Sequence, residues 1–152
     1  SVGTLRVAQN RYPEATNLFR KIVALNPRHV AALNNLALIL AESPANRVEA
    51  LQMIDQAIGV VGENPGLLDT KGAILVYDGQ SEVALPLLEV AARGTQVDPR
   101  HNLHLAAAYE QTDKREEARD KLRTALDQQL ETLILTRSDK DLLKELRTRL
   151  GL

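Results

Sequence analysis

The residues whose types and spacing could do chemistry are His101 and His104, which form a His-x-x-His pair. Histidines three positions apart lie on one face of a helix, and Asp98 stands one turn before His101. Imidazole and carboxylate groups are common ligands of zinc and related metals, so these residues could begin a metal site. No third ligand accompanies the pair convincingly, and polar side chains are ordinary where a helix begins. We therefore expect no metal here.

Other arrangements that support catalysis are missing from the sequence. There is no cysteine, no Gly-x-Ser-x-Gly segment, and no glycine-rich loop followed by Lys-Ser or Lys-Thr. The charge-dense segment 113–123 alternates acidic and basic residues, which is typical of a solvated helix face. Its carboxylates lack an apolar pocket that would raise their pKa for acid catalysis. The sequence predicts neither an enzyme nor a cofactor.

Composition narrows the class further. The 152 residues are 44% hydrophobic and 26% charged, enough for the buried core of one domain. Aromatic residues make up only 3%, and the abundance of Ala and Leu favours helices that pack closely. The formal net charge of -1 and the absence of a long apolar run argue against nucleic-acid binding and membrane insertion. Because the chain begins with Ser1, we expect it to be part of a longer protein.

An internal repeat organises the chain. Four alanines recur at intervals of 35, 34 and 34 residues, each followed four positions later by a large apolar residue. These pairs are Ala15 with Phe19, Ala50 with Ile54, Ala84 with Leu88, and Ala118 with Leu122. A second set of small residues keeps the same interval: Ala37, Gly72 and Ala106. Each period therefore predicts two amphipathic helices that cross at small side chains.

Turn residues place the helix boundaries. Pro27, Pro65 and Pro99 each follow Asn or Asp, a combination typical of a helix start. We expect helices at 2–10, 12–25, 28–42, 46–61, 65–78, 81–94, 99–112 and 115–128. Ser138 has the character of an N-cap for one more helix, whose apolar stripe is formed by Leu142, Leu143, Leu146 and Leu150.

The period and the small–large–small pattern of residues 2–129 resemble the tetratricopeptide repeat family. The segments 35–40 and 10–15 are similar to its first-helix core and its second-helix start. The departures are Leu33, Leu68 and Asn102 where the family usually has Trp. The resemblance implies an all-α, right-handed α-solenoid of antiparallel helix pairs with a C-terminal capping helix. Its single domain would comprise repeats at 1–27, 28–64, 65–98 and 99–129 and a capping segment at 130–152.

The resemblance also implies a function. In such solenoids the first helices line a concave groove, and the family binds proteins or peptides there. The candidate groove residues are Asn34, Leu38, Asp69, Ala73, Val76, Tyr77, Leu103, Ala107 and Glu110. They predict a non-catalytic scaffold or adaptor that binds a helix or an extended apolar peptide. Some of them could instead be plain core, and segment 133–135 could fold back over the groove.

Two alternatives remain open. One is a self-associating element, in which the face near Gly3, Leu5 and Val7 pairs with another copy. The other is a regulatory repeat domain attached to an enzyme outside this chain. The sequence does not decide the partner or the compartment.

Overall fold

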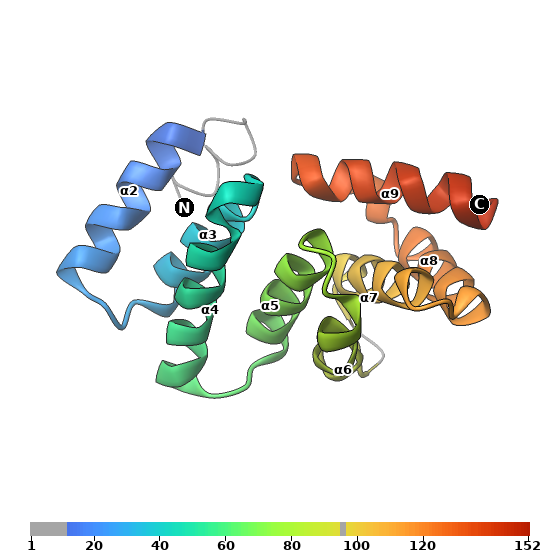
Figure 1. Ribbon diagram of the computed structural model, residues 1–152, viewed down its shortest axis with the longest axis horizontal. Coiled ribbons are helices and arrows are strands. Elements are labelled where there is room, and N and C mark those ends of the chain that lie inside the picture. The colour runs from blue at the N-terminus through green and yellow to red at the C-terminus, as the bar shows by residue number, and fades with distance from the viewer. Residues whose placement is uncertain (1–11, 95–96) are drawn as a thin grey trace.

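The computed structural model describes residues 12–94 and 97–152, and within them every regular element is helical. Figure 1 shows the helices stacked side by side along the molecule. They are α2 (Tyr12–Leu25), α3 (Val30–Leu40), α4 (Arg47–Val61), α5 (Pro65–Tyr77), α6 (Ser81–Ala91), α7 (Pro99–Gln111), α8 (Arg115–Asp127) and α9 (Arg137–Leu150). Short 3₁₀ turns occupy Pro44–Asn46 and Leu130–Thr132.

The predicted all-α solenoid of helix pairs is confirmed. The pairs are α3 with α4, α5 with α6, and α7 with α8, and consecutive pairs pack against one another. Most boundaries fall within two residues of the prediction, but α6 ends at Ala91 rather than at 94. The expected helix at 2–10, and with it the predicted self-association face, lies outside the described residues.

Local sequence explains where the first helix of each pair begins. The side chain of His29 accepts a hydrogen bond from the amide of Ala32 at the start of α3. Asn64 and Asp98 cap α5 and α7 in the same way, each with a proline as the first helical residue. Such side chains satisfy amides that the first turn leaves without partners, which fixes where each repeat begins.

Small residues lie where the helices cross, as the repeat predicts. Ala15, Ala50, Ala84 and Ala118 are all fully buried. At Gly72 the approach is closest, because a Cβ atom there would lie 2.4 Å from Leu88 Cδ2. Packing at these positions therefore depends on the absence of side-chain atoms.

The apolar interior forms two clusters. The N-terminal cluster includes Phe19, Leu36 and Ile54 and ends at Ile74. The C-terminal cluster begins at Leu75 and extends to the last buried leucine of α9. The partly buried side chains Leu51 and Tyr77 pack against both clusters. Helix α5 therefore contributes to both halves of the molecule.

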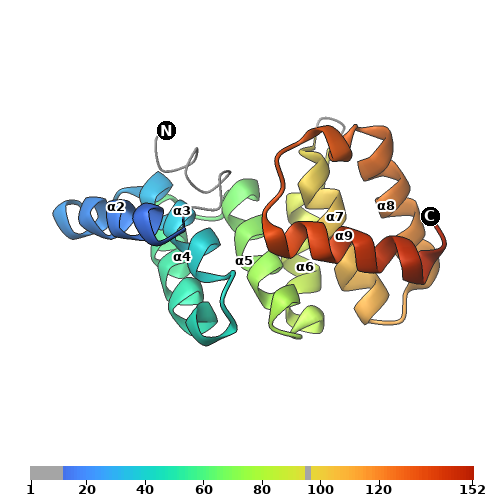
Figure 2. The ribbon, with the colours of Figure 1, turned by 90° about the horizontal axis from the view of Figure 1, so that it is seen from above.

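Helix α9 lies across the helix pairs and is not a member of a pair. Figures 1 and 2 show it across one side of α7 and α8, with its N-terminal end towards α5. We call the side of α3, α5 and α7 that faces α9 the first-helix face. Of the four leucines in the predicted stripe, Leu142, Leu146 and Leu150 are buried, and Leu143 is partly buried beside them. The N-cap prediction was wrong, because Thr136, rather than Ser138, accepts the hydrogen bond from the amide of Asp139.

Candidate functional site

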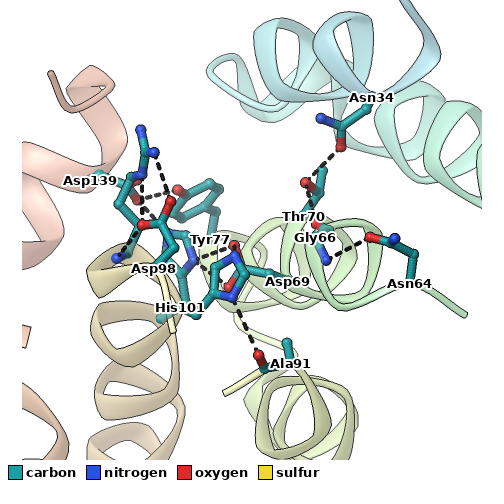
Figure 3. Close-up of polar contacts among 12 residues, drawn as sticks. Asn34, Asn64, Gly66, Asp69, Thr70, Tyr77, Ala91, Asp98, His101 and Asp139 are labelled. Carbon is teal, nitrogen blue, oxygen red and sulfur yellow. Dashed lines mark hydrogen bonds and ion pairs between the residues drawn. The ribbon is translucent and has the colours of Figure 1, made fainter. Parts of the chain in front are cut away.

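A buried polar cluster joins three helices at the first-helix face. His104 of α7 lies between two carboxylates: its Nδ1 is 2.8 Å and 3.0 Å from the oxygens of Asp69, and its Nε2 is 2.9 Å from Asp139 Oδ1. The Tyr77 hydroxyl donates a hydrogen bond to the same Asp139 oxygen. Figure 3 shows Tyr77, Asp69 and Asp139 converging on this point. We call Asp69, Tyr77, His104 and Asp139 the carboxylate–histidine cluster.

The repeat positions the first part of this cluster. Asp69 and His104 are 35 residues apart, one more than the interval of 34 between α5 and α7, so they lie in equivalent turns at neighbouring repeat positions. Tyr77 lies eight residues after Asp69, which places it near the same face of α5 two turns later. Asp139 stands three residues before Leu142, on the stripe of α9 that is buried against the solenoid. The fold therefore brings the four side chains together from separate elements.

The geometry favours a charged imidazolium at His104. Ionised carboxylates only accept hydrogen bonds, so a ring with a carboxylate at each nitrogen is best matched when both nitrogens carry protons. Burial alone would lower the pKa of His104, but Asp139 and Asp69 outweigh it and hold that pKa well above its ordinary 6.5. Burial likewise acts to raise the pKa of Asp139, but His104 and the Tyr77 hydrogen bond bring it below 3.8. The cluster is thus an ion-pair network in a nearly dry site.

The sequence-based interpretation of the histidine pair needs correction. His104 is more than a polar side chain at the helix entry, because it lies beyond the first turn of α7 and only 4% of its surface is exposed. His101 is half-buried, with its Nδ1 3.3 Å from the Ala91 carbonyl oxygen and its Nε2 3.7 Å from Asp69. Across 12–94 and 97–152, no three His, Asp or Glu residues are arranged to hold a metal ion. The carboxylate–histidine cluster can hold a charged imidazolium at His104 and fix the orientation of α9.

Further polar contacts fix both ends of α9. Near its start, the backbone amide and hydroxyl of Ser138 donate to the Glu42 carboxylate, which lies after α3. Near its end, Arg149 contacts Glu110 of α7 at 3.1 Å, and Arg115 of α8 donates to the Arg149 carbonyl at 2.7 Å. Cations that bind the last carbonyls stabilise a helix C-terminus. Together with the hydrogen bond from Tyr77 of α5 to Asp139, these contacts tie α9 to all three pairs.

The predicted groove residues separate into three groups. Asp69, Tyr77 and Glu110 contact α9 or the histidine that binds it. A second group is buried at 3% exposure or less, so its members are not open to a partner in this state: Ala73, Val76, Leu103 and Ala107. Asn34 and Leu38 on α3 are half-buried, and Asn34 accepts a hydrogen bond from Thr70 at 2.7 Å. The segment that covers the face is α9, and Ile134 of the predicted segment 133–135 is 68% exposed.

Sequence reasoning missed the roles of Asp139, Ser138 and Glu42. The sequence places Asp139 in the first turn of a capping helix, where an acidic residue is favourable for any helix. One signal was present: Asp139 shares a helical face with three leucines, where a charged residue without a partner would be costly. The sequence contains no comparable signal for Ser138 and Glu42, which are 96 residues apart.

These features define a helical-repeat solenoid whose first-helix face is covered in part by its own helix α9 (Figure 2). The tetratricopeptide repeat family matches residues 3–64, and the resemblance predicted from the repeats is confirmed. No curated protein matches the chain.

Solved structures extend the likeness along the chain. TTC0263, a thermophilic TPR protein in Thermus thermophilus, matches at a TM-score of 0.74 and 19% identity, covering 99% of this chain and 78% of that chain. MamA 41-end from Desulfovibrio magneticus RS-1 matches at a TM-score of 0.68 and 19% identity, covering 97% and 81% respectively. At this identity the comparison establishes the fold. That fold is in general a scaffold for protein interactions and is typically non-catalytic.

Proposed function

We propose that this protein is a non-catalytic interaction module that binds a helix or peptide of a protein partner on its first-helix face. One observation carries the proposal: α9 already lies on this face as an amphipathic helix, with its leucines and Asp139 buried there. Recognition of a helix in a groove uses the same elements, an apolar stripe and a few polar contacts that fix its position. The packing of the chain's own C-terminal helix on this face supports the proposal, because it has an apolar stripe and a buried carboxylate of this kind.

The part of the face on α3 is the less covered part. Leu38 is half-buried, although the other leucines of α3 are buried in the N-terminal cluster. Within the part of the chain that the structure describes, Leu38 belongs to neither apolar cluster, and Asn34 lies one turn before it. Half-exposed apolar side chains beside polar ones are typical of recognition surfaces. We therefore expect a partner to contact α3, and also those parts of α5 and α7 that α9 does not cover.

The test compares two baits that carry the same chemical change. Leu38→Glu places a charge on the first-helix face, whereas Val48→Glu places it on α4 at a position that is 71% exposed. Each bait and the wild-type chain would be used for affinity capture from a lysate, with mass spectrometry as the readout. Val76→Glu is unsuitable, because Val76 is 3% exposed and a buried charge would unfold the domain.

We expect a protein that the wild-type chain and Val48→Glu retain and Leu38→Glu loses. Circular dichroism and urea unfolding must show that both variants fold. Identical capture by all three baits would contradict binding at the α3 part of this face. The chain would then act through another surface.

In 12–94 and 97–152 there is no helix with both the length and the apolar character to cross a bilayer.

A further inference from the structure

Helix α9 has contacts that resemble those of a bound ligand more than those of another repeat. Within each repeat the two helices pack along their lengths, and small residues let them approach closely. Helix α9 crosses the first-helix face instead, and its buried surface consists of a few side chains. They are Asp139, Leu142, Leu146 and Leu150. Its opposite side is polar and exposed, including Lys140, Asp141, Lys144 and Glu145.

The linker before α9 makes a separate helix possible. Helix α8 ends at Asp127, and the next residues form a 3₁₀ turn and an extended stretch before Arg137. Gln129 adopts a left-handed conformation, and Ile134 is exposed. Leu130 and Leu135 anchor this linker in the C-terminal cluster. Movement of α9 would therefore begin after Leu135, with the rest of the cluster in place.

The face beneath α9 has a defined chemical preference. His104 is paired at its Nδ1 with Asp69 and directs its Nε2 at Asp139, so a group that takes the place of Asp139 should be an anion. Tyr77 donates a second hydrogen bond to that same carboxylate. After Asp139, the buried leucines of α9 recur at intervals of about one helical turn. An acidic group followed by large apolar residues therefore fits this face.

Building on the proposed function, we infer that α9 is an intramolecular occupant of the binding face, which a partner helix of the same chemistry displaces. That partner is an amphipathic helix with Asp or Glu three positions before the first of several Leu-like residues at four-residue spacing. Its carboxylate takes the place of Asp139 between His104 and Tyr77. The chain is then held closed by its own C-terminal helix until such a partner competes.

A labelled synthetic peptide of residues 136–152 is the probe. It would be titrated into two full chains, Asp139→Ala and the control Asp141→Ala, whose side chain is exposed on the polar side of α9. A linked helix competes at a high effective concentration, so weakening it should expose the site. We expect the peptide to bind the Asp139→Ala chain at least tenfold more tightly than the control. A peptide with Asp139→Ala should lose most of that affinity.

A locked chain provides a second, independent measurement. The sequence has no cysteine, so Glu42→Cys with Ser138→Cys gives a unique thiol pair where the two side chains now touch. Joining the thiols with a short cross-linker holds α9 in place without removing His104, Asp69 or Tyr77. We expect the peptide to bind before cross-linking and at least tenfold more weakly after it.

Equal binding by the locked and unlocked chains, or no binding to any chain, would overturn the inference. So would equal binding of the wild-type and Asp139→Ala peptides. Failure of the proposed function looks different. If lysate capture still depends on Leu38 while the peptide results are negative, the module binds a partner on α3 and α9 is a permanent cap. If peptide binding depends on α9 but capture does not depend on Leu38, the inference stands and the α3 surface is excluded.

Discussion

Two equivalent contacts between neighbouring first helices differ sharply. Between α3 and α5, Thr70 donates to Asn34 in a neutral, part-buried hydrogen bond. Between α5 and α7, one repeat later, the contact joins Asp69 to His104 and is buried. Asn34 and Asp69 are 35 residues apart and occupy matching positions. The same repeat position therefore carries a neutral hydrogen bond between α3 and α5. Between α5 and α7, where α9 covers the face, it carries a charged network.

The difference shows what a covering helix changes. A neutral, part-buried hydrogen bond contributes modest net stability, because folding exchanges bonds to water for bonds within the protein. A charged pair shielded from water is costly unless every member is satisfied. The α5–α7 contact therefore depends on Asp139, whereas the α3–α5 contact is complete by itself. Substitutions at the two contacts should therefore change the free energy of unfolding by different amounts.

The largest difference is expected from removing one side chain at each contact. His104→Ala leaves Asp69 and Asp139 buried without their shared partner, and should reduce the free energy of unfolding by about 3–5 kcal/mol. Asn34→Ala removes a neutral acceptor and should cost about 0.5–1.5 kcal/mol, because the Thr70 hydroxyl can donate its proton to the Gly66 carbonyl instead. Urea unfolding followed by circular dichroism measures both. Equal losses would mean that the buried charges add nothing to the contact.

Two glycines test the tight packing between helices, one at a helix crossing and one in open space. Gly72→Ala places a Cβ atom against Leu88 at a helix crossing and should cost about 1–3 kcal/mol. Gly59→Ala on α4 meets nothing within 4 Å, and should stabilise the chain by about 0.4–1 kcal/mol by restricting the unfolded state. Thermal unfolding would show opposite shifts in Tm. Tolerance of Gly72→Ala would contradict the close approach of α5 and α6.

Acid should reduce the contribution of Asp139 in a predictable direction. Burial acts to raise its pKa, but His104, Tyr77 and Arg100 hold it below 3.8 in the folded chain. A lowered folded-state pKa adds stability above 3.8 and loses it as the pH falls through the folded value. The wild-type chain should therefore exceed Asp139→Asn in stability at pH 7, with the gap closing below pH 3.8. Urea unfolding of both chains at several pH values tests this, and taking the difference removes the titration of unrelated groups. A gap that widens in acid would contradict the ion pair.

The smallest effect is expected at an exposed ion pair in the more open half. Arg20 of α2 contacts Glu49 of α4 at 2.6 Å, with the two side chains 47% and 35% exposed. Solvent screens such pairs, so Glu49→Ala should cost about 0.2–1 kcal/mol, and less in high salt. Urea unfolding at low and high salt measures it. A loss as large as that of His104→Ala would show that exposed charge also organises this protein.

The sequence was sufficient to predict the repeat because its cause is local. A small residue at each crossing and a large one a turn later recur in every period, and helix pairs bury them in the same way. The covered face was not predictable in the same manner. Val76 and Leu103 have the pattern of groove residues, but they are buried, because the pattern cannot distinguish a core face from a binding face. The position of Asp139 depends on a linker path and on residues of α5 and α7, which no local period encodes.

The measurement that tests the central claim most directly is hydrogen exchange, read by mass spectrometry, on the wild-type chain, Asp139→Ala and Asp141→Ala. The account predicts that Asp139→Ala removes protection from residues 137–150 while α3 to α8 stay protected. Asp141→Ala should behave as the wild type. If α9 instead loses protection only together with α7 and α8, then it is an inseparable part of the last repeat. The claim that it occupies a binding face would then be wrong.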